Sequence, residues 1–180
     1  MMQAEEYLEK IPMWTREKHS LTDIRAFLHE MGDPDRKLSI IHVAGTNGKG
    51  SVCAFLTSLY RNAGFRTGTF ISPHLVTVRE RFLLNNEMVS PGKLQAAFET
   101  VLETVNIMKE KGYSHPSYFE FLFYMAMALF ADETPELVIL ETGLGGRLDA
   151  TNVVENPLAC VITSISLDHI MYLGDTIEAV

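Results

Sequence analysis

The stretch that decides the fold of this chain is His42-Val43-Ala44-Gly45-Thr46-Asn47-Gly48-Lys49-Gly50-Ser51. An apolar run at residues 38–43 leads into it, and apolar residues at helical spacing follow it: Val52, Phe55, Leu56, Leu59 and Ala63. The order strand, glycine-rich turn, helix is typical of a phosphate-binding loop, or P-loop. The glycines and the first helical turn present backbone N–H groups to phosphate oxygens, and Lys49 adds an ammonium group. We therefore expect a nucleotide site here, with the Ser51 hydroxyl available to a magnesium ion.

The loop departs from the commonest P-loop pattern, G-x-x-x-x-G-K-[ST]. The first glycine of that pattern would fall on Val43, and the residue after Lys49 is Gly50 instead of serine or threonine. These departures weaken an assignment to the ordinary nucleotide hydrolases. Residues 45–49 instead resemble the loop of the Mur ligase superfamily, and Gly50-Ser51 resembles the folylpolyglutamate synthase/dihydrofolate synthase branch of that superfamily.

Length and composition limit the class of protein. The chain has 180 residues, of which 47% are hydrophobic and 21% charged. This is enough for one α/β domain with a single core that buries about 70% of its unfolded surface. The formal net charge of −8 argues against a general nucleic-acid or anionic-membrane surface, because both favour a basic face. An anionic nucleotide would have to be held by local donors.

The cysteines and the N-terminus indicate where the protein resides. Cys53 and Cys160 lie far apart in the sequence without a metal-binding pattern, so we expect two buried free thiols in a reducing compartment. The first residues are acidic, unlike a secretory signal. The most apolar segment, residues 121–131, is well short of the ~20 residues that span a bilayer. These observations predict a soluble, cytoplasmic protein.

Apolar spacing and cap residues predict the other elements. Helices are expected at residues 4–11, 20–31, 90–112 and from 116, strands at 66–71, 137–140 and 158–162, and a hairpin turn at Asn85-Asn86. The helix that follows residue 116 is apolar on nearly all sides, so we expect it to be buried, with Glu120 as a structural hydrogen-bond partner. The pattern predicts an α/β fold: a mostly parallel sheet with a P-loop and flanking helices.

Polar residues follow several of the predicted strands. Glu141 ends one strand, Ser72 follows a second and His169 follows a third. In an open parallel sheet, ligands bind at the carboxyl ends of the strands. We therefore expect Ser72, Glu141 and His169 to converge beside Lys49 and Ser51.

Two longer segments extend the resemblance to the folylpolyglutamate synthase branch. One joins Ser-Pro-His-Leu at 72–75 to Arg-Glu-Arg at 79–81, and the other is the glycine-rich run 141–152, which differs from the acidic motif of peptidoglycan Mur ligases. The resemblance implies that Ser51, Ser72 and Glu141 help to bind one magnesium ion and His169 a second. It also implies substrate loops that contain these residues: Pro73, His74, Arg81, Arg147 and Asp149.

The reaction that the resemblance implies is ATP-dependent amide ligation. The γ-phosphate of ATP would activate a pteroate or folate carboxylate as an acyl phosphate, which the amine of L-glutamate would attack. Lys49, Glu141 and His169 are the candidate catalytic residues, ATP and Mg²⁺ the cofactors, and no nucleic-acid or membrane partner is expected. Two alternatives remain open: a peptidoglycan-type Mur ligase that acts on a sugar nucleotide, and a nucleotide-binding module without ligase activity.

The end of the sequence bears on domain organisation. Asp175 and Glu178 have capping-box spacing, so a helix is expected to begin near Thr176, yet Val180 follows within about one turn. By the resemblance, residues 1–180 form the N-terminal part of an ATP-binding ligase domain whose C-terminal partner domain is absent. We expect such a piece to be inactive on its own.

Overall fold

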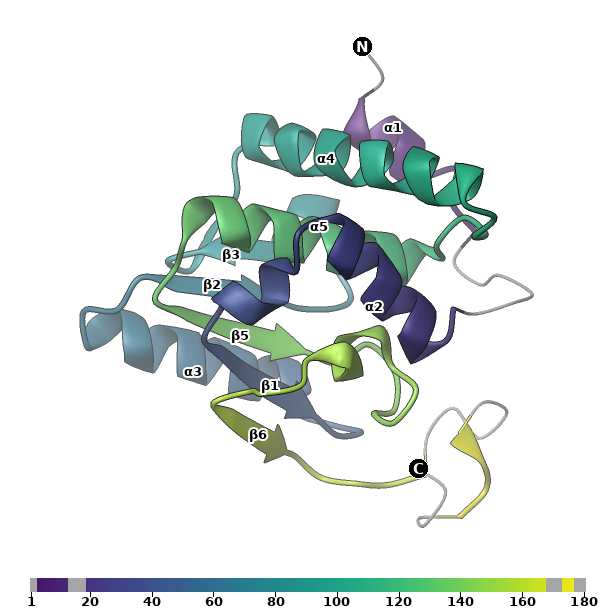
Figure 1. The fold of residues 1–180 in the computed structure, drawn as a ribbon. Coiled ribbons are helices and arrows are strands. Elements are labelled where there is room, and N and C mark those ends of the chain that lie inside the picture. The colour runs from purple at the N-terminus through teal and green to yellow at the C-terminus, as the bar shows by residue number, and fades with distance from the viewer. Residues whose placement is uncertain (1–2, 13–18, 168–172, 177–180) are drawn as a thin grey trace.

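The computed structural model describes residues 3–12, 19–167 and 173–176. Within these residues one mixed sheet runs through the molecule (Figure 1). Its strands, in spatial order, are β4 (Glu87–Met88), β3 (Phe82–Leu84), β2 (Thr67–Phe70), β5 (Leu137–Glu141), β1 (Ile40–Ala44) and β6 (Ala159–Ile162). Strands β2, β5, β1 and β6 are parallel, whereas β3 and β4 form the antiparallel margin. The predicted mostly parallel α/β fold is confirmed.

Helices cover both faces of the sheet (Figure 1). The helix α3 (Lys49–Asn62) lies on one face, and α1 (Ala4–Leu8), α2 (Leu21–Glu30), α4 (Pro91–Glu110) and α5 (Tyr118–Glu133) lie on the other. Short 3₁₀ turns connect the elements: η1 (Pro34–Lys37), η2 (Val78–Arg81) and η3 (Ala150–Val153). None of the helices in the described part of the chain is long and apolar enough to cross a membrane.

The sheet separates two hydrophobic clusters, so the expectation of a single core is wrong. Successive residues of a strand point to opposite faces. Val138 and Leu140 of β5 therefore belong to the large cluster with α4 and α5, while Leu137 and Ile139 belong to the smaller cluster under α3. A sheet covered by helices on both faces buries each strand twice, which explains the unbroken apolar run of β5.

The helix α5 is the core helix that its sequence predicts. Its side chains from Phe121 to Met127 are buried without interruption. It packs between α4 and the sheet, and its first turn lies against the segment that leads into α2. A helix that is apolar on all sides requires such surroundings.

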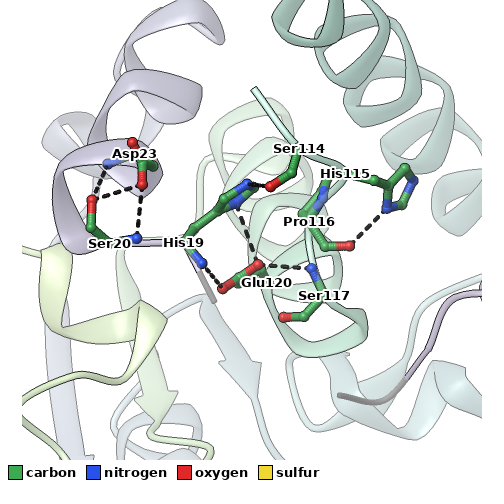
Figure 2. Close-up of polar contacts among 8 residues, drawn as sticks. All are labelled: His19, Ser20, Asp23, Ser114, His115, Pro116, Ser117 and Glu120. Carbon is green, nitrogen blue, oxygen red and sulfur yellow. Dashed lines mark hydrogen bonds and ion pairs between the residues drawn. The ribbon is translucent and has the colours of Figure 1, made fainter. Parts of the chain in front are cut away.

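A polar cluster holds the N-terminal end of α5 (Figure 2). The Glu120 carboxylate accepts hydrogen bonds from the backbone N–H of Ser117 at 2.8 Å and of His19 at 3.3 Å. The His19 Nδ1 atom lies 3.4 Å from the same carboxylate, and its Nε2 atom is 2.9 Å from the Ser114 hydroxyl. The prediction that Glu120 is a structural hydrogen-bond partner is confirmed.

The orientation of α3 differs from the sequence prediction. The expected apolar stripe included Phe55 and Leu59, but these side chains are 74% and 62% exposed. The buried face is centred instead on Cys53 and Thr57, and the Thr57 hydroxyl lies 2.7 Å from the hydroxyl of Thr69 on β2. Val52 and Leu56 of the expected stripe pack beside this face, so the face that α3 turns to the sheet combines apolar contacts with a hydrogen bond.

The cysteines also depart in part from expectation. Both are free; Cys53 is buried as predicted, whereas Cys160 is exposed. The prediction for Cys160 is wrong because β6 is the outermost parallel strand and has a described neighbour on only one side.

The hairpin turn is confirmed, since Asn85 and Asn86 both adopt positive φ angles, of 52° and 64°. The residues of the helix expected from near Thr176 onward lie mostly outside the described part of the chain.

Candidate active site

The P-loop connects β1 to α3 through a turn that contains two glycines with positive φ angles. Gly45 and Gly48 have φ angles of 134° and 85°, which L side chains rarely adopt, and Gly48 caps the helix. Lys49 opens α3, and its ammonium donates hydrogen bonds to the carbonyl oxygens of Gly45 at 2.8 Å and Thr46 at 3.3 Å. The Lys49 ammonium therefore lies against the glycine-rich turn that precedes α3.

The segment after β6 anchors this loop from the side. The Thr46 N–H donates to the Ser164 carbonyl at 2.9 Å, and the Thr46 hydroxyl donates to the Ser166 carbonyl at 2.9 Å. A Cβ atom on Gly45 would stand 2.0 Å from the Thr163 Oγ1 atom. Gly45 is thus required both by its backbone angle and by the close approach of the neighbouring strand.

Glu141 lies at the carboxyl end of β5, next to the first turn of α3. Its side chain is buried, with 2% of the residue exposed, and its Oε2 atom accepts a hydrogen bond from the Ser72 N–H at 2.9 Å. A Cβ atom on Gly50 would be 3.9 Å from both carboxylate oxygens. Burial raises the pKa of Glu141, and the Ser72 N–H and the charges of Lys49 and Arg81 act against this rise.

The donors at this edge suit magnesium. Glu141 offers one carboxylate, and Ser51 and Ser72 carry hydroxyls on the neighbouring segments. Among the described residues, no three His, Cys, Asp or Glu side chains gather in a way that could hold a metal ion. Magnesium fits this arrangement because it commonly takes one or two carboxylates and completes its shell with phosphate oxygens and water. His169, the expected ligand of a second ion, lies outside the described residues.

A pocket of about 210 Å³ opens between the P-loop and a second glycine-rich loop. The P-loop side contributes Ala44, Gly45, Thr46 and Lys49, and the opposite wall contains residues 143–146. The remaining lining residues are apolar: Ile162, Ile165 and Leu173. The combination of an ammonium, backbone N–H groups and apolar walls can accommodate the phosphates and part of the base or sugar of a nucleotide.

The second glycine-rich loop is held by Asp149. This buried carboxylate accepts hydrogen bonds from the backbone N–H groups of Gly143 at 3.1 Å, Leu144 at 2.9 Å and Thr151 at 3.0 Å. Arg147, by contrast, is exposed at the tip of the loop. Of these two expected substrate-loop residues, Arg147 faces solvent and Asp149 bonds within its own loop.

The loop after β2 contains the other expected substrate residues. The buried Arg81 guanidinium donates from Nε to the Nδ1 atom of His74 at 2.8 Å and stacks 5.6 Å from the centre of the Tyr118 ring. Burial lowers the pKa of both Arg81 and His74. Because arginine only donates, His74 Nδ1 must be the acceptor, which leaves the proton on Nε2 in the neutral ring. Pro73 is exposed and follows a cis peptide bond.

Comparison with known proteins places these features in a family. A folylpolyglutamate synthase of Arabidopsis thaliana is 47% identical over 141 residues, which cover 78% of this chain and 25% of that protein. A dihydrofolate synthase/folylpolyglutamate synthase of Bacillus subtilis is 42% identical over 164 residues, 91% of this chain and 38% of that protein. The structure of Mycobacterium tuberculosis folylpolyglutamate synthase complexed with ADP matches 96% of this chain with a TM-score of 0.87 at 38% identity. This chain belongs to the folylpolyglutamate synthase family.

The match to the folylpolyglutamate synthase family covers only part of each relative. The chain spans about a quarter of the length of the Arabidopsis protein and 38% of the Mycobacterium chain. No protein-family model matches the chain. The resemblance that the P-loop and the run 141–152 indicate is nevertheless confirmed at the level of the family.

Two side chains beside this candidate site were not singled out from the sequence. His42 reaches from β1 to the Thr151 hydroxyl, and Phe119 supports the second glycine-rich loop, since a Cβ on Gly143 would stand 2.6 Å from its ring. The only signal in the sequence is a histidine inside an otherwise apolar strand. Such a buried polar residue must have a partner, but the identity of that partner depends on the fold.

Proposed function

We propose that this chain is the ATP-binding part of a ligase that joins L-glutamate to the carboxylate of a folate or dihydropteroate. The γ-phosphoryl group of ATP is transferred to that carboxylate, giving an acyl phosphate and ADP. The amine of L-glutamate then attacks the acyl carbon, phosphate leaves, and the nitrogen loses a proton to complete the amide. The observation that carries the proposal is the meeting of the P-loop lysine and the Glu141 carboxylate at one edge of the sheet.

Lys49 and the P-loop stabilise the negative charge of the phosphates. The ammonium and the N–H groups at the start of α3 bind the β- and γ-phosphates and favour the negative charge that develops during phosphoryl transfer. Glu141, together with the hydroxyls of Ser51 and Ser72, would hold magnesium, which would supply positive charge against the phosphates. His169 contributes to a second magnesium site.

The two loops at the mouth of the site bind the other substrates. The buried Arg81 and the half-buried His74 form a hydrogen-bonded pair on one side, and the exposed Arg147 offers a cation on the other. Both kinds of group suit substrates with several carboxylates, such as folates and glutamate. Pro73 and Asp149 set the backbone of these loops. The names of the relatives, folylpolyglutamate and dihydrofolate synthases, support the folate assignment over a sugar nucleotide.

The exposed edge at β6 supports the proposal that the chain is the N-terminal part of a larger ligase domain. Leu158, directly before this strand, is 66% exposed, and Ile162, its last residue, is 70% exposed. Parallel strands are normally buried on both faces, so further protein is expected to cover them. A cytoplasmic location is also part of the proposal, and the two free cysteines support it because exposed thiols persist in reducing compartments.

The test is phosphate release from ATP by the chain extended beyond Val180, with L-glutamate and each candidate acceptor in turn. Glutamate-dependent release with dihydropteroate or tetrahydrofolate is the expected result. Release only with a muramoyl nucleotide would move the protein to the peptidoglycan branch. Magnesium-dependent ATP binding without phosphate release in the presence of any acceptor would indicate a nucleotide-binding module. That result would overturn the ligase assignment.

The role of Lys49 has its own control in the same assay. Lys49→Ala is expected to abolish turnover while leaving the unfolding transition nearly unchanged, because its ammonium bonds only to loop carbonyls in the structure. Lys37→Ala is the matched control, since this lysine lies on η1, away from the site. Near-normal turnover of Lys49→Ala would refute the assigned role.

A further inference from the structure

A chain of hydrogen bonds between buried side chains links β1 to the second glycine-rich loop. His42 Nε2 lies 2.8 Å from the Thr151 hydroxyl, and that hydroxyl donates to Asp149 Oδ1 at 2.6 Å. All three residues are at least nine-tenths buried, and Thr151 is fully so. Thr151 uses its only proton on Asp149, so it must accept from His42, which fixes the ring tautomer with the proton on Nε2.

The other oxygen of Asp149 carries the chain to the pocket. Asp149 Oδ2 accepts hydrogen bonds from the backbone N–H groups of Gly143 and Leu144, and both residues line the pocket opposite Lys49. At the other end, His42 lies on β1 two residues before the pocket wall begins at Ala44. The series of hydrogen bonds therefore connects the two walls of one cavity through side chains that do not line it.

Hydrogen-bond donors, and not a cation, surround the Asp149 carboxylate. Four donors converge on the Asp149 carboxylate: the N–H groups of Gly143, Leu144 and Thr151 and the Thr151 hydroxyl. Burial lowers the pKa of His42, against the weaker opposing effect of the Asp149 charge, and this favours the neutral ring that the tautomer argument requires. A buried network in which both oxygens of the carboxylate accept hydrogen bonds from fixed donors is rigid, so it is suited to setting a loop position.

We propose that His42 and Thr151 are positioning residues that orient Asp149, so that its carboxylate holds the Gly143–Leu144 backbone at a fixed distance from the P-loop. The inference deepens the proposed function, and rests on it in one respect, namely that the occupant of the pocket is a nucleotide. Neither residue contacts the pocket, so the effect on binding reaches the ligand only through the loop.

The first readout does not depend on any ligand. Thr151→Val removes the hydroxyl at nearly constant volume, and Thr151→Ser retains it. Thr57→Val is the control, because the Thr57 hydroxyl is equally buried and hydrogen-bonded but lies on α3, where that helix faces β2. We expect Thr151→Val to speed hydrogen exchange at the Gly143 and Leu144 amides at least tenfold, and Thr151→Ser and Thr57→Val to change it less than twofold.

The second readout is ADP affinity, measured by calorimetry on the same variants well below their unfolding temperatures. Outer residues that orient a binding group typically change affinity by about 10- to 100-fold, and we expect a loss in that range for Thr151→Val. His42→Leu is expected to behave likewise, and His42→Gln, which restores a donor, to recover most of the affinity. Thr57→Val is expected to lose stability without losing affinity.

The outcomes separate this inference from the proposed function. Unchanged amide exchange in Thr151→Val would overturn the positioning role, whatever the nucleotide affinity. An equal loss of ADP affinity in Thr57→Val and Thr151→Val would overturn it as well, since the effect would then follow stability alone. If the unsubstituted chain binds no ADP while exchange responds as expected, the nucleotide assignment fails and the positioning of the loop stands.

Discussion

The Glu141 carboxylate accepts a hydrogen bond from the backbone N–H of Ser72, with Oε2 and N 2.9 Å apart. This contact joins the carboxyl ends of β5 and β2, which are neighbours in the sheet although 69 positions separate the two residues. It also places a buried negative charge beside the first turn of α3. The local surroundings oppose that charge, because burial raises the pKa of Glu141 despite the nearby Lys49 and Arg81.

Replacing Glu141 by glutamine should therefore stabilise the protein at neutral pH. A raised pKa means that the folded state binds the proton more tightly than the unfolded state, so ionisation above the ordinary glutamate pKa of 4.5 destabilises the fold. Glu141→Gln removes that effect. We expect a higher free energy of unfolding at pH 7 than in the unsubstituted chain, and a difference that disappears as the pH falls below 4.5, measured by urea denaturation. A Glu141→Gln variant that is less stable than the unsubstituted chain at pH 7 would contradict the argument.

Gly45→Ala should damage both stability and the site. The new methyl group would meet Thr163 Oγ1 at 2.0 Å, at a φ angle of 134° that alanine does not adopt without strain. We expect a loss of about 2–4 kcal/mol in the free energy of unfolding, together with loss of nucleotide binding. Gly146→Ala is the control within the same pocket, because nothing lies within 4 Å of its Cβ position. Equal stability of the two variants would show that the P-loop can relax away from the neighbouring strand.

The two cysteines should differ sharply in reactivity. Burial raises the pKa of Cys53 to about 12, with the charge of Glu141 adding to the rise, whereas Cys160 is exposed. The thiolate is the reactive form. In the native protein at pH 8 we expect a thiol reagent to label one equivalent rapidly at Cys160, and a second only after denaturation. Rapid labelling of Cys160→Ser would mean that Cys53 is accessible after all.

The cluster at the start of α5 should be important for stability. Glu120→Ala removes the acceptor of two backbone N–H groups and the partner of His19 (Figure 2). We expect a loss of about 3 kcal/mol, because buried donors are left without partners. Thermal and urea unfolding would measure it, with the exposed Glu103→Ala on α4 as the matched control. A loss below about 0.5 kcal/mol, the usual limit for exposed positions, would show that other groups or water satisfy these donors.

Local sequence signals predicted the elements, and the contacts between elements explain the departures. Ser20, Ser90 and Asn85-Asn86 act through neighbours in the sequence, so the cap and turn residues could be identified without a structure. The Thr57–Thr69 contact on the buried face of α3 joins two elements, and the exposure of Cys160 depends on the position of β6 in the sheet.

In the candidate site, too, the features that depend on a short segment could be predicted and the contacts between distant segments could not. The P-loop and the position of Glu141 after its strand were both identified from the sequence, because each depends on a short segment. The tie between Asp149 and its own loop, the stacking of Arg81 on Tyr118 and the link from His42 to Thr151 join residues that only the tertiary structure brings together. No periodicity or spacing in the sequence encodes such pairs.

The position of β1 between β5 and β6 has a consequence for biosynthesis. Ile40 pairs with Val138, and Ile41 pairs with Ala159, so the strand that leads into the P-loop is made early and pairs late. At a synthesis rate of about 5–20 residues per second, β1 leaves the ribosome on the order of ten seconds before its first partner. During that interval the apolar side chains of β1 must be shielded from water and from aggregation, either by chaperones or by transient contacts with helices. The candidate nucleotide pocket, which is lined by residues on both sides of β6, is therefore among the last parts of this region to form on the ribosome.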